Sequence, residues 1–278
     1  MLSKCLVALF IALTFFFIAK KSHPIADRSG TSLGNNNDQI LSTQGSLLKV
    51  ATFNIQTGKS VDGVRNIKAA AQLVADQHLI GIQEVYAPGW LNKLGLSRLD
   101  FTQSQLESLT ENKAFEYLLS ATRKRWFREQ RGNAILSGLP IDKWRIQALP
   151  DYTGKSFRNM TVIEFSWQGT GVTFINTHLH TGQGREEQLE LVLAEFAKHP
   201  IAILVGDFNS RRNTKALAEA IEDPLITDAI ALAQIDTHNP EQRIDWILTK
   251  GFKIESGKTL GKGISDHPYY EVSLALLN

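Results

Sequence analysis

The chain has little cysteine and little net charge for its 278 residues. Its one cysteine, Cys5, excludes an intramolecular disulfide and any metal site built from thiolates, so a bound metal would need oxygen or imidazole ligands. A formal net charge of +2 does not by itself indicate nucleic-acid binding, which depends on a concentrated basic patch. Five tryptophans and five tyrosines give no clear stacking platform for single-stranded nucleic acid.

Sequence motifs of several common enzyme classes are also missing. There is no GxSxG elbow, which disfavours a serine hydrolase of that type. Neither a P-loop nor a dinucleotide-binding glycine fingerprint is present. The apolar content of 43% is nevertheless sufficient for a sizeable core in one large domain.

The first 46 residues differ in character from the rest of the chain. Leu6–Ala19 is an apolar run flanked by lysines, which indicates a signal peptide or N-terminal membrane anchor over residues 1–21. No clean small-x-small cleavage site follows, so we favour an uncleaved anchor and a membrane-anchored or exported, extracytoplasmic protein. Residues 22–46 include stretches rich in serine, glycine and asparagine and predict a flexible tether, and the folded domain is expected over residues 47–278.

Strands and helices alternate through the folded domain. Apolar runs and their periodicity predict strands at Leu48–Asn54, Leu79–Val85, Glu116–Ala121, Asn133–Ser137, Trp144–Leu149, Arg158–Trp167, Gly171–His178, the start of Ile201–Arg211, Arg243–Thr249 and Tyr269–Leu276. They predict helices at Val64–Gln77, Gln103–Thr110, Gly184–Lys198 and Lys215–Ile221. This mixed order, with consecutive strands in the middle, predicts an α/β domain with more than one sheet.

The segment Ile201–Arg211, IAILVGDFNSR, is the most informative stretch. A short buried strand ends in a carboxylate and a carboxamide two positions apart. The alternation of a strand would place Asp207 and Asn209 on one face, where both could reach one ion or phosphate. Taken alone, such residues after a strand more often form a turn.

Other predicted strands also end in polar residues that a core would not favour. Each has an ordinary structural explanation: a turn cap, an exposed edge residue or a core histidine. Together they indicate a site, because ligand sites in α/β proteins collect at strand ends. These residues are Asn54, Glu84, His178, Asp245, Asp266 and His267.

The residue types in this set define a reaction class. Carboxylates and carboxamides without a thiolate favour a hard divalent cation, Mg²⁺ or Mn²⁺. Such a cation neutralises phosphate charge and lowers the pKa of water, and a histidine beside an acid can exchange a proton near neutral pH. The sequence therefore predicts metal-assisted phosphoester hydrolysis.

A basic run at Arg123–Arg128, RKRWFR, has two interpretations. It could contact a phosphodiester backbone, or it could be a solvated strand edge.

Six short motifs in order carry a resemblance to a known family. TFN, QE, NTHLH, GDFN, RIDWI and SDHP, spread from Phe53 to Pro268, closely resemble the endonuclease/exonuclease/phosphatase superfamily of metal-dependent phosphoesterases. The segment RGNAILSGLPI at Arg131–Ile141 resembles the family's central strand. The resemblance implies a four-layer α/β sandwich, with two mixed β-sheets face to face, flanked by helices, and an active site at one edge.

The resemblance also implies roles for individual residues. Asn54, Glu84 and Asp266 would lie at the metal, with Glu84 as the main ligand. Asp207 and Asn209 would orient or activate the attacking water and hold the phosphate.

Three further residues complete the implied site. His267, polarised by Asp245, would be the general base, and His178 would hydrogen-bond the phosphate in the transition state.

From these observations we expect a Mg²⁺- or Mn²⁺-dependent phosphodiesterase or phosphatase, monomeric, with nucleic acid as the first substrate class. A lipid headgroup is the alternative, because an N-terminal anchor would hold the domain at a bilayer. The tyrosine that some DNA-directed members carry in the middle of the chain has no match, which weakens a DNA-repair interpretation. A non-catalytic binding module of the same fold would have lost a catalytic group, and all eight are present.

Overall fold

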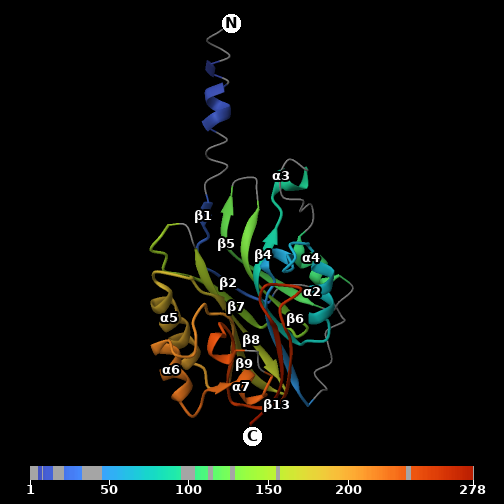
Figure 1. Cartoon of the computed structure of the whole chain (residues 1–278), viewed down its shortest axis with the longest axis vertical. Helices are drawn as coiled ribbons and strands as arrows, with labels where there is room; N and C mark the ends of the chain where they lie inside the picture. Colours follow the sequence, from blue (N-terminus) through green and yellow to red (C-terminus); the bar gives the residue numbers. More distant parts are fainter. Residues whose placement is uncertain are drawn as a thin grey trace.

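The structure, a computed structural model, describes residues 6–7, 9–14, 22–32, 46–94, 104–111, 115–125, 129–154, 157–235 and 239–277. The described strands form two sheets of seven (Figure 1). In spatial order the first sheet contains β1 (Ser22–Pro24), β5 (Glu116–Arg125), β6 (Gln130–Ser137), β4 (Leu79–Ala87), β3 (Leu48–Asn54), β14 (Tyr269–Leu276) and β13 (Phe252–Leu260). The second contains β11 (Thr227–Asp228), β12 (Asp245–Lys250), β10 (Ala202–Asp207), β9 (Thr170–His178), β8 (Arg158–Trp167), β7 (Lys143–Leu149) and β2 (Arg28–Thr31).

Both sheets are mixed. The pairs β3/β4 and β9/β10 are parallel, and the other strand pairs are antiparallel. Each parallel pair is joined by a crossover that contains a helix, as parallel neighbours require. The mixed sheets confirm the α/β class expected from the order of elements.

Strand alternation explains how both faces of each sheet are buried. In β10, Ile203 and Val205 face the core between the sheets, whereas Ala202 and Leu204 face the second outer core. Val50 of β3 likewise lies in the central core, and its neighbour Ala51 lies in the opposite outer core.

Helices cover the two outer cores. Helices α2 (Ile67–Val74) and α4 (Gln105–Thr110) contribute apolar residues to the outer face of the first sheet, and α5 (Arg185–Ala197) and α6 (Lys215–Glu222) to that of the second. Figure 1 shows these pairs on opposite sides of the molecule. The four layers confirm the expected sandwich. Shorter elements are α3 (Trp90–Lys93), α7 (Ala229–Leu232), and the 3-10 turns η1 (Gln56–Gly58) and η2 (Pro240–Gln242).

The two sheets approach closely behind the strand ends. A Cβ placed on Gly81 of β4 would lie 2.3 Å from Val205 Cγ2. Beside it, Gln83 Nε2 donates to Asn176 Oδ1 at 2.8 Å, and Asn176 Nδ2 donates to Ala134 O at 2.9 Å. These buried amides join strands of both sheets and fix the sheets relative to each other.

The structure differs from the sequence prediction at the chain's beginning. Residues 22–46 were expected to form a tether, but β1 pairs with β5 and β2 pairs with β7, so each adds an edge strand to a different sheet. Residues 33–45 of the expected tether lie outside the described residues. In the described part of the chain, no helix has the length and apolar character needed to cross a membrane.

Strand β13 was not predicted from the sequence. Its side chains are mostly exposed, including those of Lys253, Glu255 and Lys258, so it has no apolar alternation. It pairs with β14 at the edge of the first sheet, where charged side chains are common.

Candidate active site

Three neighbouring strands of the second sheet bring acidic and imidazole side chains together by register alone. In the parallel pair β9/β10, His178 lies beside Asp207, and in the antiparallel pair β10/β12, Asp207 lies beside Asp245. All three side chains are almost fully buried. The edge of this sheet therefore carries one histidine and two carboxylates in a row.

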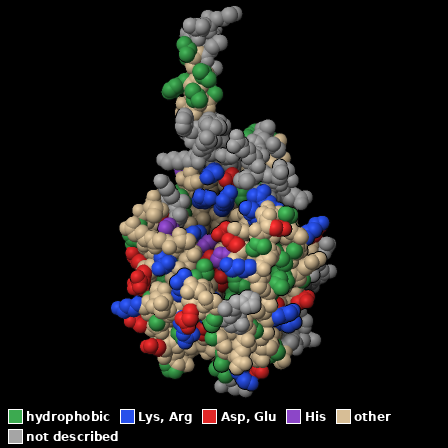
Figure 2. All heavy atoms as spheres, viewed as in Figure 1, with side chains coloured by type: hydrophobic (Ala, Val, Ile, Leu, Met, Phe, Trp, Pro, Cys, Tyr) green, Lys and Arg blue, Asp and Glu red, His purple; other side chains and the backbone are tan. Residues whose placement is uncertain are grey.

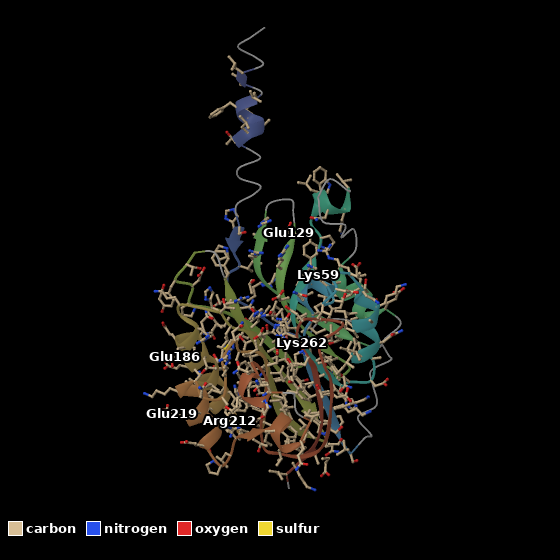
Figure 3. All side chains as sticks on the ribbon, in the orientation of Figure 1. Lys59, Glu129, Glu186, Arg212, Glu219 and Lys262 are labelled. Carbon is tan, nitrogen blue, oxygen red and sulfur yellow. The ribbon has the colours of Figure 1, made fainter. Side chains whose placement is uncertain are left out.

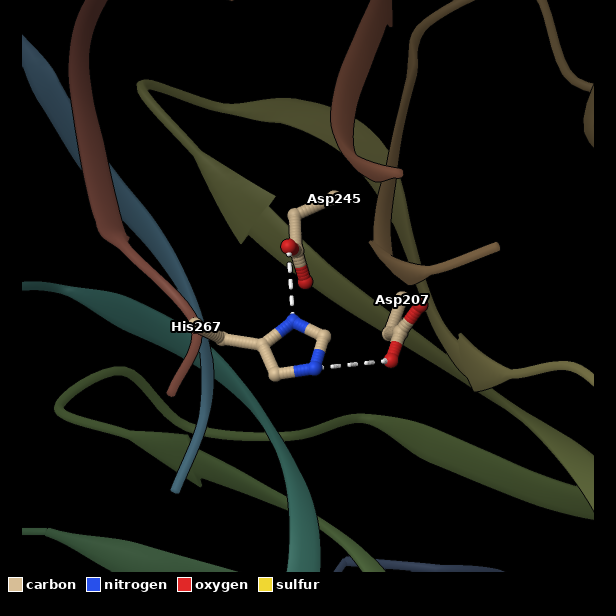
Figure 4. A group of neighbouring side chains, drawn as sticks. All are labelled: Asp207, Asp245 and His267. Carbon is tan, nitrogen blue, oxygen red and sulfur yellow. Dashed lines mark hydrogen bonds and ion pairs between the residues drawn. The ribbon is translucent and has the colours of Figure 1, made fainter. Parts of the chain in front are cut away.

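His267 reaches this row from the loop before β14. Its Nδ1 lies 2.8 Å from Asp245 Oδ2, and its Nε2 lies 3.7 Å from Asp207 Oδ2 (Figure 4). Ligand atoms of Asp207, Asp245 and His267 all lie within 4.8 Å of one another. The imidazole thus links the two carboxylates.

Burial and the neighbouring charges shift the pKa values of this group. Burial and repulsion from Asp245 raise the pKa of Asp207 to about 7, against opposing effects of His267, Asn209 and Asn54. Burial lowers the pKa of His267, but the Asp245 hydrogen bond and the nearby carboxylates raise it by more, to about 9. Asp207 can therefore exchange a proton near neutral pH, while His267 is held as the imidazolium.

His178 has the opposite protonation preference. Its Nε2 lies 3.4 Å from Asp207 Oδ2. Burial, and the positive charges of Arg158 and His267, hold its pKa well below the usual value. His178 is therefore a neutral imidazole beside the charged His267.

Asn54 and Glu84 approach Asp207 from the first sheet. Asn54 Nδ2 donates to Asp207 Oδ2 at 3.0 Å and to Glu84 Oε1 at 3.5 Å, and its Oδ1 accepts from the Gln56 backbone N–H at 3.1 Å. Asn54 thus presents its amide nitrogen to both carboxylates. Glu84 lies in β4 at an irregularity in its pairing with β6, and its φ of 60° is left-handed. Strained backbone of this kind collects at functional sites.

Asp266 is held in place by two residues that the sequence analysis did not identify. Gln56 Nε2 donates to Asp266 Oδ2 at 2.9 Å. Ser265 Oγ donates to Asn54 O at 2.7 Å and so ties the loop of Asp266 and His267 to the end of β3. Gln56 lies two positions after the TFN motif and Ser265 is the first residue of SDHP, but nothing in this spacing indicates these contacts.

Asn209 lies differently from the prediction. Strand β10 ends at Asp207, and Asn209 has a left-handed φ of 47°, so strand alternation does not extend to it. Its Nδ2 donates to Leu179 O at 2.9 Å, and its backbone N–H donates to Asp207 Oδ1 at 2.9 Å. The prediction that strand alternation places the side chains of Asp207 and Asn209 on one face is therefore wrong.

The expectation that every polar residue follows the end of a strand also needs correction. Asn54, His178 and Asp207 are last residues of their strands, but Asp245 is the first residue of β12, and Asp266 and His267 precede β14. Antiparallel pairing explains this, because the start of one strand lies beside the end of its neighbour.

Arg158 is a further site residue that the sequence analysis placed only in a strand. It begins β8, which runs antiparallel to β9, so it lies at the edge where His178 ends its strand. It is affected by the charges of Asp207 and Glu84, and burial lowers its pKa. The hairpin of the two strands was the signal that could have identified it.

Two cavities flank the row of His178, Asp207 and Asp245, which we call the catalytic row. One, of about 750 Å³, is lined by residues that include Arg243, Asp245, Lys262 and His267. The other, of about 250 Å³, is lined by residues that include Glu84, Arg158 and His178. Figure 2 shows acidic, basic and histidine side chains gathered at the hollowed centre of this face, and Figure 3 labels Lys262 there. A ligand can therefore approach the row from solvent.

The donor set at this edge fits a hard divalent cation. The carboxylates of Glu84 and Asp266 offer oxygen ligands at the rim, and both residues are partly exposed. Asp245 Oδ1 is buried and has no hydrogen-bond partner among the described residues, which leaves it able to accept. Carboxylate oxygens without sulfur ligands suit Mg²⁺ or Mn²⁺.

The sequence matches the model of the Endonuclease/Exonuclease/phosphatase family over residues 51–267. The match covers most of the chain and includes every predicted site residue. The chain therefore belongs to this family, whose members are phosphoesterase hydrolases. No curated protein matches the chain.

Solved structures of this family have the same fold. An endonuclease/exonuclease/phosphatase from Beutenbergia cavernae is 18% identical with a TM-score of 0.68, over 84% of this chain and 72% of that chain. A mannosyl-6-phosphatase of Bacteroides thetaiotaomicron is 20% identical with a TM-score of 0.63, over 82% of this chain and 100% of that chain. A humanized D. rerio TDP2 is 15% identical with a TM-score of 0.61, over 83% of this chain and 99% of that chain.

Proposed function

We propose that this chain is a divalent-metal-dependent phosphoester hydrolase that cleaves phosphodiesters of nucleic acid by attack of water on phosphorus. The observation that carries the proposal is the position of Asp207. Its carboxylate lies between two histidines, accepts a hydrogen bond from Asn54 and is buried beside Asp245. This arrangement provides a base with a pKa near the operating pH.

Glu84 and Asp266 would hold the cation. A divalent cation supplies charge neutralisation at the phosphate and polarises its oxygens. Asn54 and Gln56 position these two carboxylates through their amide groups, at 3.5 and 2.9 Å. In the arrangement described, Asn54 acts on the site as a hydrogen-bond donor.

Asp207 takes the proton of the attacking water. Its raised pKa, about 7, makes it a stronger base than an ordinary carboxylate. The backbone N–H of Asn209 holds its other oxygen at 2.9 Å and so fixes the direction of the carboxylate. As the new P–O bond forms, the bond to the leaving oxygen breaks.

His267 and His178 would stabilise the phosphate as its charge increases. His267, an imidazolium held by Asp245, donates a charge-assisted hydrogen bond, and neutral His178 donates a second. The protonation states favour Asp207 over His267 as the general base, so of the two roles that the family resemblance implies, activation of water by Asp207 is preferred to base catalysis by His267.

A lipid headgroup is the second candidate substrate, supported by the N-terminal segment. Apolar side chains there are exposed, Phe10 at 71% and Ile11 at 62%. Such a segment would anchor the protein in a membrane and place an extracytoplasmic or membrane-facing domain near lipid. The TDP2 and mannosyl-6-phosphatase neighbours, by their names, do not favour this candidate over nucleic acid.

The test is hydrolysis by the full chain in detergent, after chelation, with Mg²⁺, Mn²⁺ or neither. The substrates are single- and double-stranded DNA, RNA, sphingomyelin, phosphoinositides, mannose 6-phosphate and bis-p-nitrophenyl phosphate. Metal-dependent turnover of nucleic acid supports the proposal, and turnover of lipid alone supports the second candidate. Turnover of none, by a folded protein that binds Mn²⁺, would support a non-catalytic binding module instead.

A further inference from the structure

The smaller cavity is lined by three arginines. Arg123 comes from the end of β5, Arg131 from the start of β6 and Arg158 from the start of β8, and the cavity has a volume of about 250 Å³. We call these three residues with their cavity the arginine pocket. Glu84 and His178 form part of its wall, so it opens directly onto the catalytic row.

Two of these arginines are held together by strand pairing. Arg123 and Arg131 are register partners across the antiparallel pair β5/β6. A Cβ on the adjacent Gly132 would lie 2.2 Å from Ser120 O, so only glycine permits the close approach of the strands there. Like charges directly opposite each other destabilise a sheet, which indicates that their positions serve something other than stability.

The guanidinium groups have few partners in the described part of the chain. None of the three forms an ion pair there within 4.0 Å, whereas the neighbouring Arg125 pairs with Glu129 at 2.9 Å. The Nε atoms of Arg131 and Arg158 are buried and have no hydrogen-bond partner among the described residues. Buried donors without partners are costly, and an anion that enters the pocket would satisfy them.

The pocket extends away from the reacting centre. Arg158 is affected by the charges of Asp207 and Glu84. Arg123 and Arg131 lie on β5 and β6 of the first sheet. Asn54, which donates to Asp207, lies on β3 of the same sheet, and β4 with Glu84 runs between them. An anion held by Arg123 and Arg131 would therefore lie beyond Glu84 from Asp207, apart from the phosphate that water attacks.

We propose that the arginine pocket binds a second phosphate group of the substrate, so that preferred substrates carry another phosphate beside the scissile phosphoester. The identity of the scissile group rests on the proposed function. Fork-shaped guanidinium groups bind phosphate through paired hydrogen bonds. The next phosphate of a nucleic acid strand and a phosphorylated lipid headgroup both offer this chemistry.

A binding experiment tests the pocket without turnover. Inorganic phosphate and pyrophosphate are titrated into the chelated full chain by calorimetry, for the wild type, R123Q and R131Q. The matched control is K124Q, which removes an exposed positive charge from the same strand outside the pocket. We expect affinity to fall about tenfold or more in R123Q and R131Q, and little in K124Q.

Thermal unfolding separates a ligand site from a structural role. Removal of one of two opposed positive charges should leave Tm of anion-free R123Q equal to or above that of the wild type, while its affinity for phosphate falls. Unchanged affinity in both arginine variants, or an equal loss in K124Q, would overturn the inference.

Matched substrates then identify the source of the second phosphate. One pair is thymidine 5′-(p-nitrophenyl phosphate) with a 3′-hydroxyl or a 3′-phosphate, and the other is glycerophosphoinositol without or with a 4-phosphate. The wild type should prefer the phosphorylated member of one pair by about tenfold in kcat/KM, and R123Q and R131Q should lose that preference. Equal turnover of both members by all variants would overturn the inference and leave the proposed function intact. No turnover of any member would overturn the proposed function, and the phosphate titration alone would then decide for or against the pocket.

Discussion

Asp207 and Asp245 are register partners across the antiparallel strands β10 and β12, so two carboxylates meet at the edge of one sheet. Asp245 raises the pKa of Asp207 by repulsion, after the larger effect of burial, and it also holds His267 Nδ1 at 2.8 Å. Asp245 therefore controls the protonation of both the proposed base and its imidazolium neighbour.

The variant D245N should shift the pH dependence of turnover. Without the Asp245 charge, the pKa of Asp207 and that of His267 both fall, so both limbs of the kcat/KM profile should move to lower pH. The value of kcat at pH 8 should also fall by about 10² to 10³, because His267 loses the partner that orients it. The profile is measured with bis-p-nitrophenyl phosphate.

The control for this variant is D142N, which removes an exposed carboxylate that does not line either cavity. Its profile should match the wild type. If D245N lost activity with no movement of either limb, Asp245 would have only a structural role.

Much of the fold followed from short-range patterns in the sequence. The sequence predicts the ends of β3 (Leu48–Asn54), β14 (Tyr269–Leu276) and α5 to within a residue or two. It does so because the apolar residues of these elements recur with a strand or helix period. The sequence does not predict strands β1, β2 and β13. Each lies at a sheet edge, where the strand forms by pairing with a neighbour distant in sequence and the side chains are mostly polar and exposed.

The candidate site was predicted as a set of residues but not as an arrangement. Polar residues at strand ends identified His178 and Asp207, whereas the approach of Arg158 and Gln56 depends on antiparallel pairing and on a loop between distant strands. Local sequence periodicity contains no information on such contacts. The positive φ of Glu84 and Asn209 was likewise not visible in the sequence.

Gly81 should tolerate no side chain. In G81A the new Cβ would lie 2.3 Å from Val205 Cγ2 and 2.8 Å from Asn176 Oδ1, so the sheets must separate or shift. We expect the free energy of unfolding to fall by about 2–3 kcal/mol, measured by chemical denaturation. The double variant G81A/V205A should lose less than the sum of the two single losses, because V205A removes part of the clash.

A second glycine provides the control for this prediction. Gly171, also in a strand, has no atom within 4 Å of an added Cβ, so G171A should leave stability nearly unchanged. An equal loss of stability in G81A and G171A would mean that the close approach of the two sheets is not what excludes a side chain at residue 81.

Glu195 should stabilise the fold only above acidic pH. Burial raises its pKa, but hydrogen bonds and ion pairs with Lys198, His199 and Arg145 lower it by more, from 4.5 to about 2. A carboxylate with a lowered folded-state pKa adds stability that is fully present above its unfolded value, near 4.5, and is lost as pH falls toward about 2.

The matched variants are E195Q and E219Q. At pH 7, E195Q should lower the free energy of unfolding by about 1–2 kcal/mol, and the difference from the wild type should shrink between pH 4.5 and 2. E219Q removes an exposed i,i+4 pair at 4.0 Å and should cost less than about 0.5 kcal/mol. A difference for E195Q that stays constant with pH would show that its ionisation is not involved.

Metal binding should depend on the two rim carboxylates. E84Q and D266N should each weaken Mn²⁺ binding by about tenfold or more, measured by electron paramagnetic resonance, because each removes a charged oxygen ligand. E164Q, an exposed carboxylate variant on β8 outside both cavities, should bind Mn²⁺ as the wild type does. Wild-type affinity in both rim variants would place the cation elsewhere.

The most direct test of the central claim is the hydrolysis of bis-p-nitrophenyl phosphate by the chelated wild type and by D207N, with and without added Mg²⁺ or Mn²⁺. We predict turnover that returns only with metal, and a fall of about 10³ or more in kcat for D207N, whose Tm and Mn²⁺ affinity stay near those of the wild type. Turnover by D207N at the wild-type rate, or turnover that chelation does not remove, would contradict a metal-dependent phosphoesterase centred on Asp207.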